Sequence, residues 1–331
     1  ERQSGNISLP EIAPANGIKI AVVGSGPAGL SFAGDMAKKG YDVYVFEALH
    51  EIGGVLKYGI PEFRLPNAIV DVEIENLSKM GVHFQTDVIV GKSISVDELE
   101  KQGFKGIFVA SGAGLPNFMN IPGENFINIM SSNEYLTRVN LMDAANPKTD
   151  TPINLGKNVL VVGGGNTAMD SCRTAKRLGA NVTLAYRRSD AELPARAEEV
   201  KHAKEEGINF MTLHNPVEYL ADEKGAVKQA ILAVMKLGEP DESGRRSPID
   251  TGERVTIDCD QVVVAVGVSP NPLVPKSIAG LELGRKNTIA VGDDMQSSRK
   301  LLYAGGDIVR GGATVILAMG DGRRAAANMH A

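Results

Sequence analysis

Two glycine-rich segments hold the residues best suited to chemistry in this sequence. The first is Gly24-Ser25-Gly26-Pro27-Ala28-Gly29 and the second is Gly163-Gly164-Gly165-Asn166-Thr167-Ala168. In such a turn the first glycine permits a tight bend and the second lets a pyrophosphate approach the backbone. The third small residue lets helix and strand pack. Free N–H groups at the start of the following helix can then bind the phosphates.

The residues at the end of the next strand distinguish the two segments. Glu47 follows the first, where its carboxylate can accept hydrogen bonds from ribose hydroxyls. Tyr186 stands at the corresponding position of the second, and Arg187 and Arg188 follow it. Loss of the acid removes repulsion against a 2′-phosphate, and two guanidiniums provide donors for it. We therefore expect NADP at the second segment, with Arg196 as a further candidate contact; the alternative is a solvated basic pair.

Three further features favour FAD at the first segment. Gly53-Gly54 follow Glu47 closely, where a long dinucleotide needs a second close approach of the backbone. An apolar strand at 107–110 ends in the small residues Ser111 and Gly112. A second apolar strand, at 301–304, leads to Gly306-Asp307, and a helix through Ala327 follows.

Strands and helices alternate around both segments. Apolar runs predict strands at 18–23, 42–47, 159–162, 182–186 and 262–266, and helices at about 30–39, 166–178 and 196–206. This order predicts an α/β fold with two Rossmann-like dinucleotide-binding domains. Polar linkers at 143–152 and 269–275 predict a discontinuous FAD-binding domain, 1–149 and 271–331, with an NADP-binding domain, 150–270, inserted in it.

Composition excludes several other functions. The formal net charge is −5 and no long basic run occurs, so neither nucleic acid nor an anionic membrane is an expected partner. Two cysteines and five scattered histidines offer no metal-ligand spacing, and no metal is expected. No apolar run approaches the roughly 18 residues of a membrane span. The absence of a disulfide framework predicts a cytoplasmic location.

The sequence resembles the flavoprotein disulfide-reductase-like superfamily with two glutathione-reductase-like nucleotide-binding domains, and within it the glutamate synthase small-subunit family. The resemblance is carried by segments 51–66, 163–170, 186–196 and 304–311, which read EIGGVLKYGIPEFRLP, GGGNTAMD, YRRSDAELPAR and AGGDIVRG. That family includes the NADPH-oxidising subunit of glutamate synthase. It also includes the NADPH-binding subunit of an electron-bifurcating NADH-dependent reduced ferredoxin:NADP oxidoreductase.

The resemblance implies a role for further residues. Asp307 would bind the flavin ribityl chain, the helix start at Ala313 to Val315 would face the flavin ring, and the 59–64 loop would contact it. The predicted FAD contacts are Gly24, Ser25, Gly26, Pro27, Ala28, Gly29, Glu47, Ala48, Gly54, Leu56, Gly59, Ile60, Arg64, Val88, Ser111, Gly112, Gly306, Asp307, Ala313, Thr314 and Val315. The predicted NADP contacts are Gly163, Gly164, Gly165, Asn166, Thr167, Ala168, Arg187, Arg188, Arg196, Ala265 and Gly267.

The expected reaction is hydride transfer from NADPH to FAD. No catalytic side chain is predicted, since the cofactors carry the chemistry. Family members hold two 4Fe–4S clusters in an N-terminal cysteine-rich segment that this sequence does not contain. The resemblance therefore implies clusters upstream or on a partner, such as the glutamate synthase large subunit or an equivalent iron–sulfur acceptor. Alternatives are the bifurcating ferredoxin:NADP oxidoreductase subunit and a non-catalytic FAD- and NADP-binding redox sensor.

Overall fold

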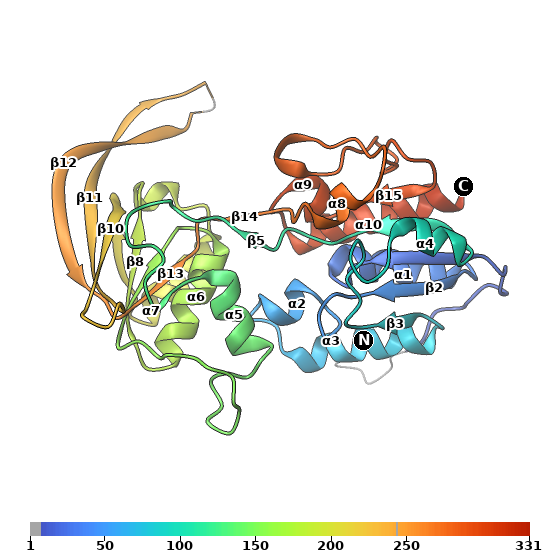
Figure 1. Ribbon diagram of the computed structural model, residues 1–331, viewed down its shortest axis with the longest axis horizontal. Helices are drawn as coiled ribbons and strands as arrows, with labels where there is room; N and C mark the ends of the chain where they lie inside the picture. Colours follow the sequence, from blue (N-terminus) through green and yellow to red (C-terminus); the bar gives the residue numbers. More distant parts are fainter. Residues whose placement is uncertain (1–7, 243) are drawn as a thin grey trace. The chain divides into compact units, whose positions relative to one another are not determined.

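The computed structural model describes residues 8–242 and 244–331, which form two compact units. Unit 1 contains the chain up to Lys57, Glu62–Leu115 and Val268–Ala331. Unit 2 contains Tyr58–Pro61 and Pro116–Gly267, so most of it is one insertion into the sequence of unit 1. Many elements of both units are labelled in Figure 1.

Unit 1 is built on a five-stranded parallel sheet of order β15-β4-β1-β2-β3. Its strands are β1 (Lys19–Val23), β2 (Asp42–Phe46), β3 (His83–Gln85), β4 (Phe104–Val109) and β15 (Leu302–Ala304). Its helices are α1 (Pro27–Lys38), α3 (Asn67–Lys79), α4 (Val96–Lys101), α8 (Leu273–Ser277), α9 (Asp307–Arg310) and α10 (Val315–His330), and α2 (Val55–Tyr58) ends at the unit boundary.

Both faces of the unit 1 sheet are covered, which explains why its strands are continuous apolar runs. Ile20 and Val22 of β1 join a core with α1 and α10, while Ala21 and Val23 join a second core on the other face. Phe32 of α1 stacks on Phe108 of β4 with ring centroids 4.3 Å apart. Because the strands are parallel, the carboxyl ends of β1, β2, β4 and β15 lie at one edge of the sheet.

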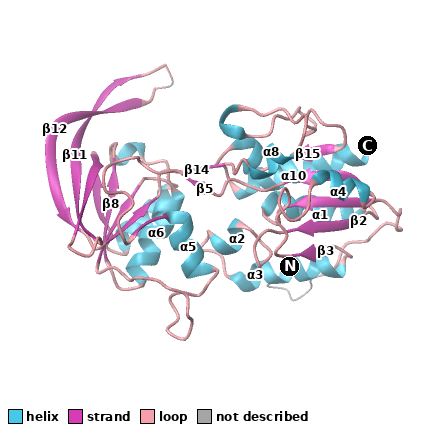
Figure 2. Cartoon of the chain, viewed as in Figure 1, coloured by secondary structure: helices cyan, strands magenta, loops and turns pink. Residues whose placement is uncertain are grey.

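Unit 2 repeats the pattern with a parallel sheet of order β6-β13-β7-β8-β9. Its strands are β6 (Ile129–Ser131), β7 (Asn158–Val162), β8 (Asn181–Tyr186), β9 (Asn209–Thr212) and β13 (Gln261–Val264), and its helices are α5 (Ser132–Asn140), α6 (Asn166–Arg177) and α7 (Ala197–Glu205). An antiparallel sheet joins β10 (His214–Ala221), β11 (Val227–Pro240) and β12 (Arg246–Asp258). Figure 2 shows β11 and β12 as a long curved hairpin.

The first unit boundary differs from the predicted linker. Residues 116–149, which the linker prediction assigns to the first domain, group with unit 2 instead. The reason is that β6 pairs with β13 and α5 packs on α6. A two-stranded sheet of β5 (Leu115–Pro116) and β14 (Val268–Ser269) marks the boundary. Within the part of the chain that the structure describes, no helix has the length and apolar character needed to cross a membrane.

Candidate functional site

The first glycine turn connects β1 to α1, and each glycine meets a different steric requirement. A Cβ on Gly24 would lie 2.5 Å from the Ala110 carbonyl oxygen, and one on Gly29 would lie 2.0 Å from the Gly24 carbonyl oxygen. A Cβ on Gly26 would meet no atom within 4 Å. Gly26 is also the N-cap of α1 and makes no side-chain capping bond. Its side of the turn is therefore open, with helix N–H groups available for a phosphate.

Glu47 is held at the turn by a hydrogen-bond network. It is only 6% exposed, and its Oε2 accepts from the Ser25 N–H at 2.9 Å and from the Ser25 hydroxyl. Its Oε1 accepts from the Leu49 N–H at 2.9 Å. The Ser25 hydroxyl also accepts from the Gly53 N–H at 2.9 Å. The predicted ribose acid thus joins the glycine turn to the Gly53-Gly54 segment, and it keeps acceptor capacity on Oε1.

The other predicted segments of unit 1 meet at the same turn. A Cβ on Gly54 would lie 2.9 Å from the Gly26 Cα, and one on Gly306 would lie 3.1 Å from the Ala28 Cβ. Ser111 follows β4, and its buried hydroxyl has no hydrogen-bond partner among the described residues. The structure therefore brings together four segments that are far apart in the sequence.

Gly306 and Asp307 are fixed by a carboxylate that the sequence did not indicate. Asp321 of α10 is 1% exposed, and its Oδ2 accepts from the Gly306 N–H at 3.1 Å. Its two oxygens also accept from Arg310 Nε and Nη2, both at 2.6 Å. Such a bidentate pair is geometrically specific. It ties α9 and the Gly306 turn to α10.

Asp307 itself faces the start of α10. Its Oδ1 accepts from the Ala313 N–H at 3.1 Å, and Thr314 caps the helix by accepting from the Leu317 N–H at 3.4 Å. Burial, together with the nearby Asp321 carboxylate, raises the pKa of Asp307. Ile316, in the first turn of the helix, is 75% exposed. The helix start is thus accessible, as the flavin prediction for Ala313 to Val315 requires.

The remaining predicted FAD contacts lie in varied surroundings. Val88 donates its N–H to the Glu47 carbonyl at 2.9 Å, whereas Ala48 is exposed and Gly112 adopts a φ of +69°. Leu56 and Arg64 are half-buried, and Gly59 and Ile60 group with unit 2.

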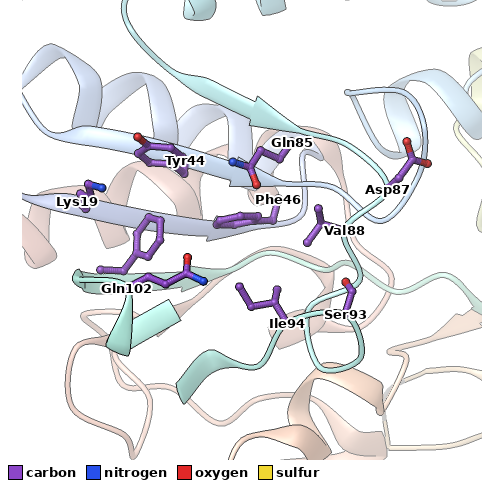
Figure 3. A pocket seen from close by; sticks show the side chains of 10 residues that line it. Lys19, Tyr44, Phe46, Gln85, Asp87, Val88, Ser93, Ile94 and Gln102 are labelled. Carbon is purple, nitrogen blue, oxygen red and sulfur yellow. The ribbon is translucent and has the colours of Figure 1, made fainter. Parts of the chain in front are cut away.

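A hollow of about 380 Å³ also lies on unit 1 (Figure 3). Tyr44 and Phe46 of β2 and Gln85 of β3 line it. Val88 is the one predicted FAD contact among its lining residues, so the hollow does not coincide with the glycine turn.

The second glycine turn, between β7 and α6, has the same backbone plan. A Cβ on Gly163 would lie 2.3 Å from the Ala265 carbonyl oxygen, and one on Gly165 would meet no atom within 4 Å. Gly165 is the N-cap of α6, again without a side-chain capping bond, and Ala168 is fully buried. Gly164 differs, because its Cβ position would lie 2.7 Å from the Tyr186 ring. The ring fills the side of Gly164 and leaves the side of Gly165 open.

The predicted arginines occupy different surroundings. Arg187 is exposed, whereas Arg188 is buried and donates from Nε to the Arg246 carbonyl at 2.9 Å. Arg196 is exposed at the N-cap of α7, and its N–H donates to Asn166 Oδ1 at 2.9 Å. Asn166 therefore supports the loop before α7. Thr167 accepts at its carbonyl from the Ser171 hydroxyl, and Gly267 is exposed with a φ of +101°.

Sequence reasoning missed two supporting groups. Asp321 is an isolated acid in a helix, and nothing in its spacing relates it to Gly306. Arg246 is distant from Arg188 in the sequence, and the structure brings its carbonyl to Arg188 Nε. The pair Arg245-Arg246 was the available signal for the second group.

Both turns fit a dinucleotide, and FAD fits unit 1. The open side of Gly26, the unpartnered Ser111 hydroxyl and the exposed start of α10 provide a phosphate cradle, a free polar group and an accessible helix terminus. The fold and these turns define a two-domain oxidoreductase that binds two nucleotides.

Comparison with known proteins agrees with this class. The family model described as pyridine nucleotide-disulphide oxidoreductase matches residues 18–322. The chain therefore belongs to that family, and it is an FAD-dependent NADPH oxidoreductase. This confirms the predicted resemblance and enzyme class.

Similar curated proteins include subunits of larger enzymes. The chain is 40% identical to the NADP(+)-dependent formate dehydrogenase subunit beta of Moorella thermoacetica, covering 96% of this chain and 44% of that protein. It is 36% identical to the glutamate synthase (NADPH) small chain of Azospirillum brasilense, covering 95% and 66%. It is 37% identical to the NADPH-Fe(3+) oxidoreductase subunit beta of Geobacter sulfurreducens, covering 95% and 49%. The chain thus spans about half to two thirds of these relatives.

Solved structures share the fold. FprA from Mycobacterium tuberculosis in complex with NADPH superposes with a TM-score of 0.79 at 20% identity, covering 96% of this chain and 84% of FprA. Thioredoxin reductase from Lactococcus lactis superposes with a TM-score of 0.73 at 22% identity, covering 95% and 98%. Both likenesses confirm the predicted fold class.

Proposed function

We propose that this chain is the NADPH-oxidising flavoprotein module of a larger electron-transfer enzyme, as in the small subunit of glutamate synthase. FAD would bind at the first glycine turn and NADPH at the second. The observation that carries this assignment is the chemical difference between the turns. The first holds a buried carboxylate, Glu47, whereas arginines follow the second at Arg187 and Arg188.

The chain's own residues bind and orient in this proposal. The N–H groups opening α1 and α6 would bind the two pyrophosphates, and Glu47 would accept from the ribose of FAD. Asp307 would hold the ribityl chain, positioned by Asp321. Bound FAD supplies the chemistry of accepting a hydride and releasing single electrons.

The proposed acceptor is a set of iron–sulfur clusters outside these residues. The relatives support this because they are subunits named for glutamate synthase, formate dehydrogenase and ferric iron reduction. We assign the chain to the glutamate synthase type on its segments 51–66 and 304–311.

Anaerobic mixing of the FAD-loaded chain with NADPH or NADH tests the proposal. We expect rapid bleaching of the flavin absorbance with NADPH and much slower bleaching with NADH. A chain that takes up no FAD, or whose flavin is bleached only by NADH, contradicts it. A chain that binds both nucleotides without bleaching is the redox sensor instead.

A further inference from the structure

Arg246 connects the long β11–β12 hairpin to the segment that follows β8. Its carbonyl accepts from Arg188 Nε at 2.9 Å, and its own Nε donates to Glu192 Oε1 at 3.0 Å. The side chain is 42% exposed, and that of Glu192 is 19% exposed. The hairpin therefore brings Arg246 against Arg188, one of the two arginines predicted to select NADP.

Positive charge exceeds negative charge at this position. Arg187 and Arg188 directly follow β8, and Arg246 contacts Arg188 through its main-chain carbonyl. Neither Arg187 nor Arg188 forms an ion pair with a carboxylate within the described ranges. Glu192 is held on its other oxygen by the Ser189 N–H at 3.2 Å and the Ser189 hydroxyl at 2.9 Å. Of these three arginines, only Arg246 pairs with a carboxylate within the described residues, and this excess of positive charge favours binding of a multiply charged anion.

The hydrogen bonds of the individual guanidinium nitrogens show which arginine can bind a ligand. Arg188 donates from Nε to a carbonyl, and Arg246 donates from Nε to Glu192. Within the described residues the terminal nitrogens of both side chains remain for a ligand. Arg254, also on β12, contrasts with them. It donates to both oxygens of Asp250, at 2.8 and 2.9 Å, and is already paired in a bidentate manner.

We infer that Arg246 is a specificity-determining residue that binds the 2′-phosphate of NADP together with Arg187 and Arg188. Glu192 positions its guanidinium through Nε, and it opposes the phosphate by its charge. The inference rests on the proposed binding of NADP at the second glycine turn, and it adds the hairpin as a functional part of that site.

Calorimetric titration of the FAD-loaded full chain with NADP⁺ and NAD⁺ tests this role without turnover. For Arg246→Ala we expect NADP⁺ affinity to fall roughly tenfold, equivalent to ~1.4 kcal/mol, with NAD⁺ affinity unchanged. The Arg188 contact should persist because it uses the main-chain carbonyl. Arg254→Ala is the matched control, since it removes one arginine from the same strand, and it should alter neither affinity.

Glu192→Gln should change the NADP⁺ affinity in the opposite direction. The amide oxygen can still accept from Ser189, while the amide NH₂ no longer accepts from Arg246 Nε. The negative charge is gone and the Arg246 guanidinium is released for the phosphate, so NADP⁺ affinity should rise while NAD⁺ affinity stays constant. Equal losses for both nucleotides in Arg246→Ala, or no loss, overturn the inference. A wild-type chain that binds no NADP⁺ instead overturns the proposed function, so the two failures are distinguishable.

Discussion

The two glycine turns share a backbone plan but differ in the residue after the first glycine. In unit 1 this residue is Ser25, which bonds the Glu47 carboxylate through its N–H and its hydroxyl. In unit 2 it is Gly164, and the Tyr186 ring occupies the space that a side chain would take. Glu47 and Tyr186 hold corresponding places at the ends of their strands.

This difference shows that the turn and the strand end form one unit of specificity. A serine supplies donors for an acid, whereas a glycine makes room for an aromatic ring, so each pair of residues is mutually dependent. The acid that we propose to accept ribose hydroxyls therefore has a dedicated partner. Exchange of only one member of either pair should harm its own domain.

The largest expected effect tests what the turns have in common. Gly29→Ala places a Cβ 2.0 Å from the Gly24 carbonyl, a backbone atom that cannot easily move. We expect the free energy of unfolding to fall by about 3 kcal/mol, the upper end for overpacking. Urea denaturation of the chain measures this.

Gly26→Ala is the control for this prediction. Its Cβ meets no protein atom within 4 Å, so stability should persist while FAD affinity falls. Equal stability losses in the two variants would show that Gly29 has no special packing role.

Exchanging the distinguishing residues should have an intermediate effect. Ser25→Gly removes the hydroxyl partner of Glu47 and Gly53, and a lost buried hydrogen bond costs about 1–2 kcal/mol of stability. Gly164→Ser drives a side chain into the Tyr186 ring, with a loss of about 1–3 kcal/mol.

A double-mutant cycle checks the second exchange. Tyr186→Ala removes the ring that Gly164→Ser would meet, so the two stability losses should be clearly less than additive when combined. Strict additivity would mean that the ring and the turn are independent.

A smaller effect is expected at the carboxylate that has no counterpart in unit 2. Asp321→Asn weakens the bidentate pair with Arg310, which is about a third exposed. Solvent screening at Arg310 limits the expected stability loss to about 1 kcal/mol. FAD affinity should fall as well, because Gly306 and Asp307 lose their fixed position. Flavin fluorescence titration measures the affinity, and an unchanged value would assign Asp321 a purely structural role.

The smallest expected effect concerns pH. Burial and the Asp321 carboxylate raise the pKa of Asp307, so the folded chain binds more protons than the unfolded chain above the ordinary value of 3.8. Stability therefore falls as pH rises through this window. Asp307→Asn should stabilise the flavin-free chain at neutral pH by less than about 1 kcal/mol after solvent screening. Denaturation at several pH values should show this gain vanishing near pH 4, and a gain that grows on acidification would contradict it.

The sequence predicted the repeated units well because their signals are local. The helix expected at about 30–39 is Pro27–Lys38, which begins three residues earlier, and the strand expected at 182–186 is Asn181–Tyr186. Packing at Gly29 also followed from glycine chemistry. The approach of Gly54 to a dinucleotide stays a prediction, and the structure places Gly54 against Gly26.

What the sequence could not provide depends on contacts between distant residues. The pairing of Asp321 with Gly306, and of Arg188 with the Arg246 carbonyl, requires the folded chain to bring separate elements together. The unit boundary at Leu115 depends on β6 joining β13 across a long intervening stretch. Polar composition alone therefore placed that boundary elsewhere.

The close contact of Ala28 with Gly306 and Gly322 has a consequence for synthesis on the ribosome. A Cβ on Gly322 would lie 2.3 Å from the Ala28 carbonyl oxygen, so the first helix requires a partner that is translated much later than the helix itself. Unit 2 is nearly contiguous and is complete once Gly267 has emerged. Translation thus completes unit 2 before unit 1, and we expect a chain that is truncated after Gly267 to lack a stable first unit.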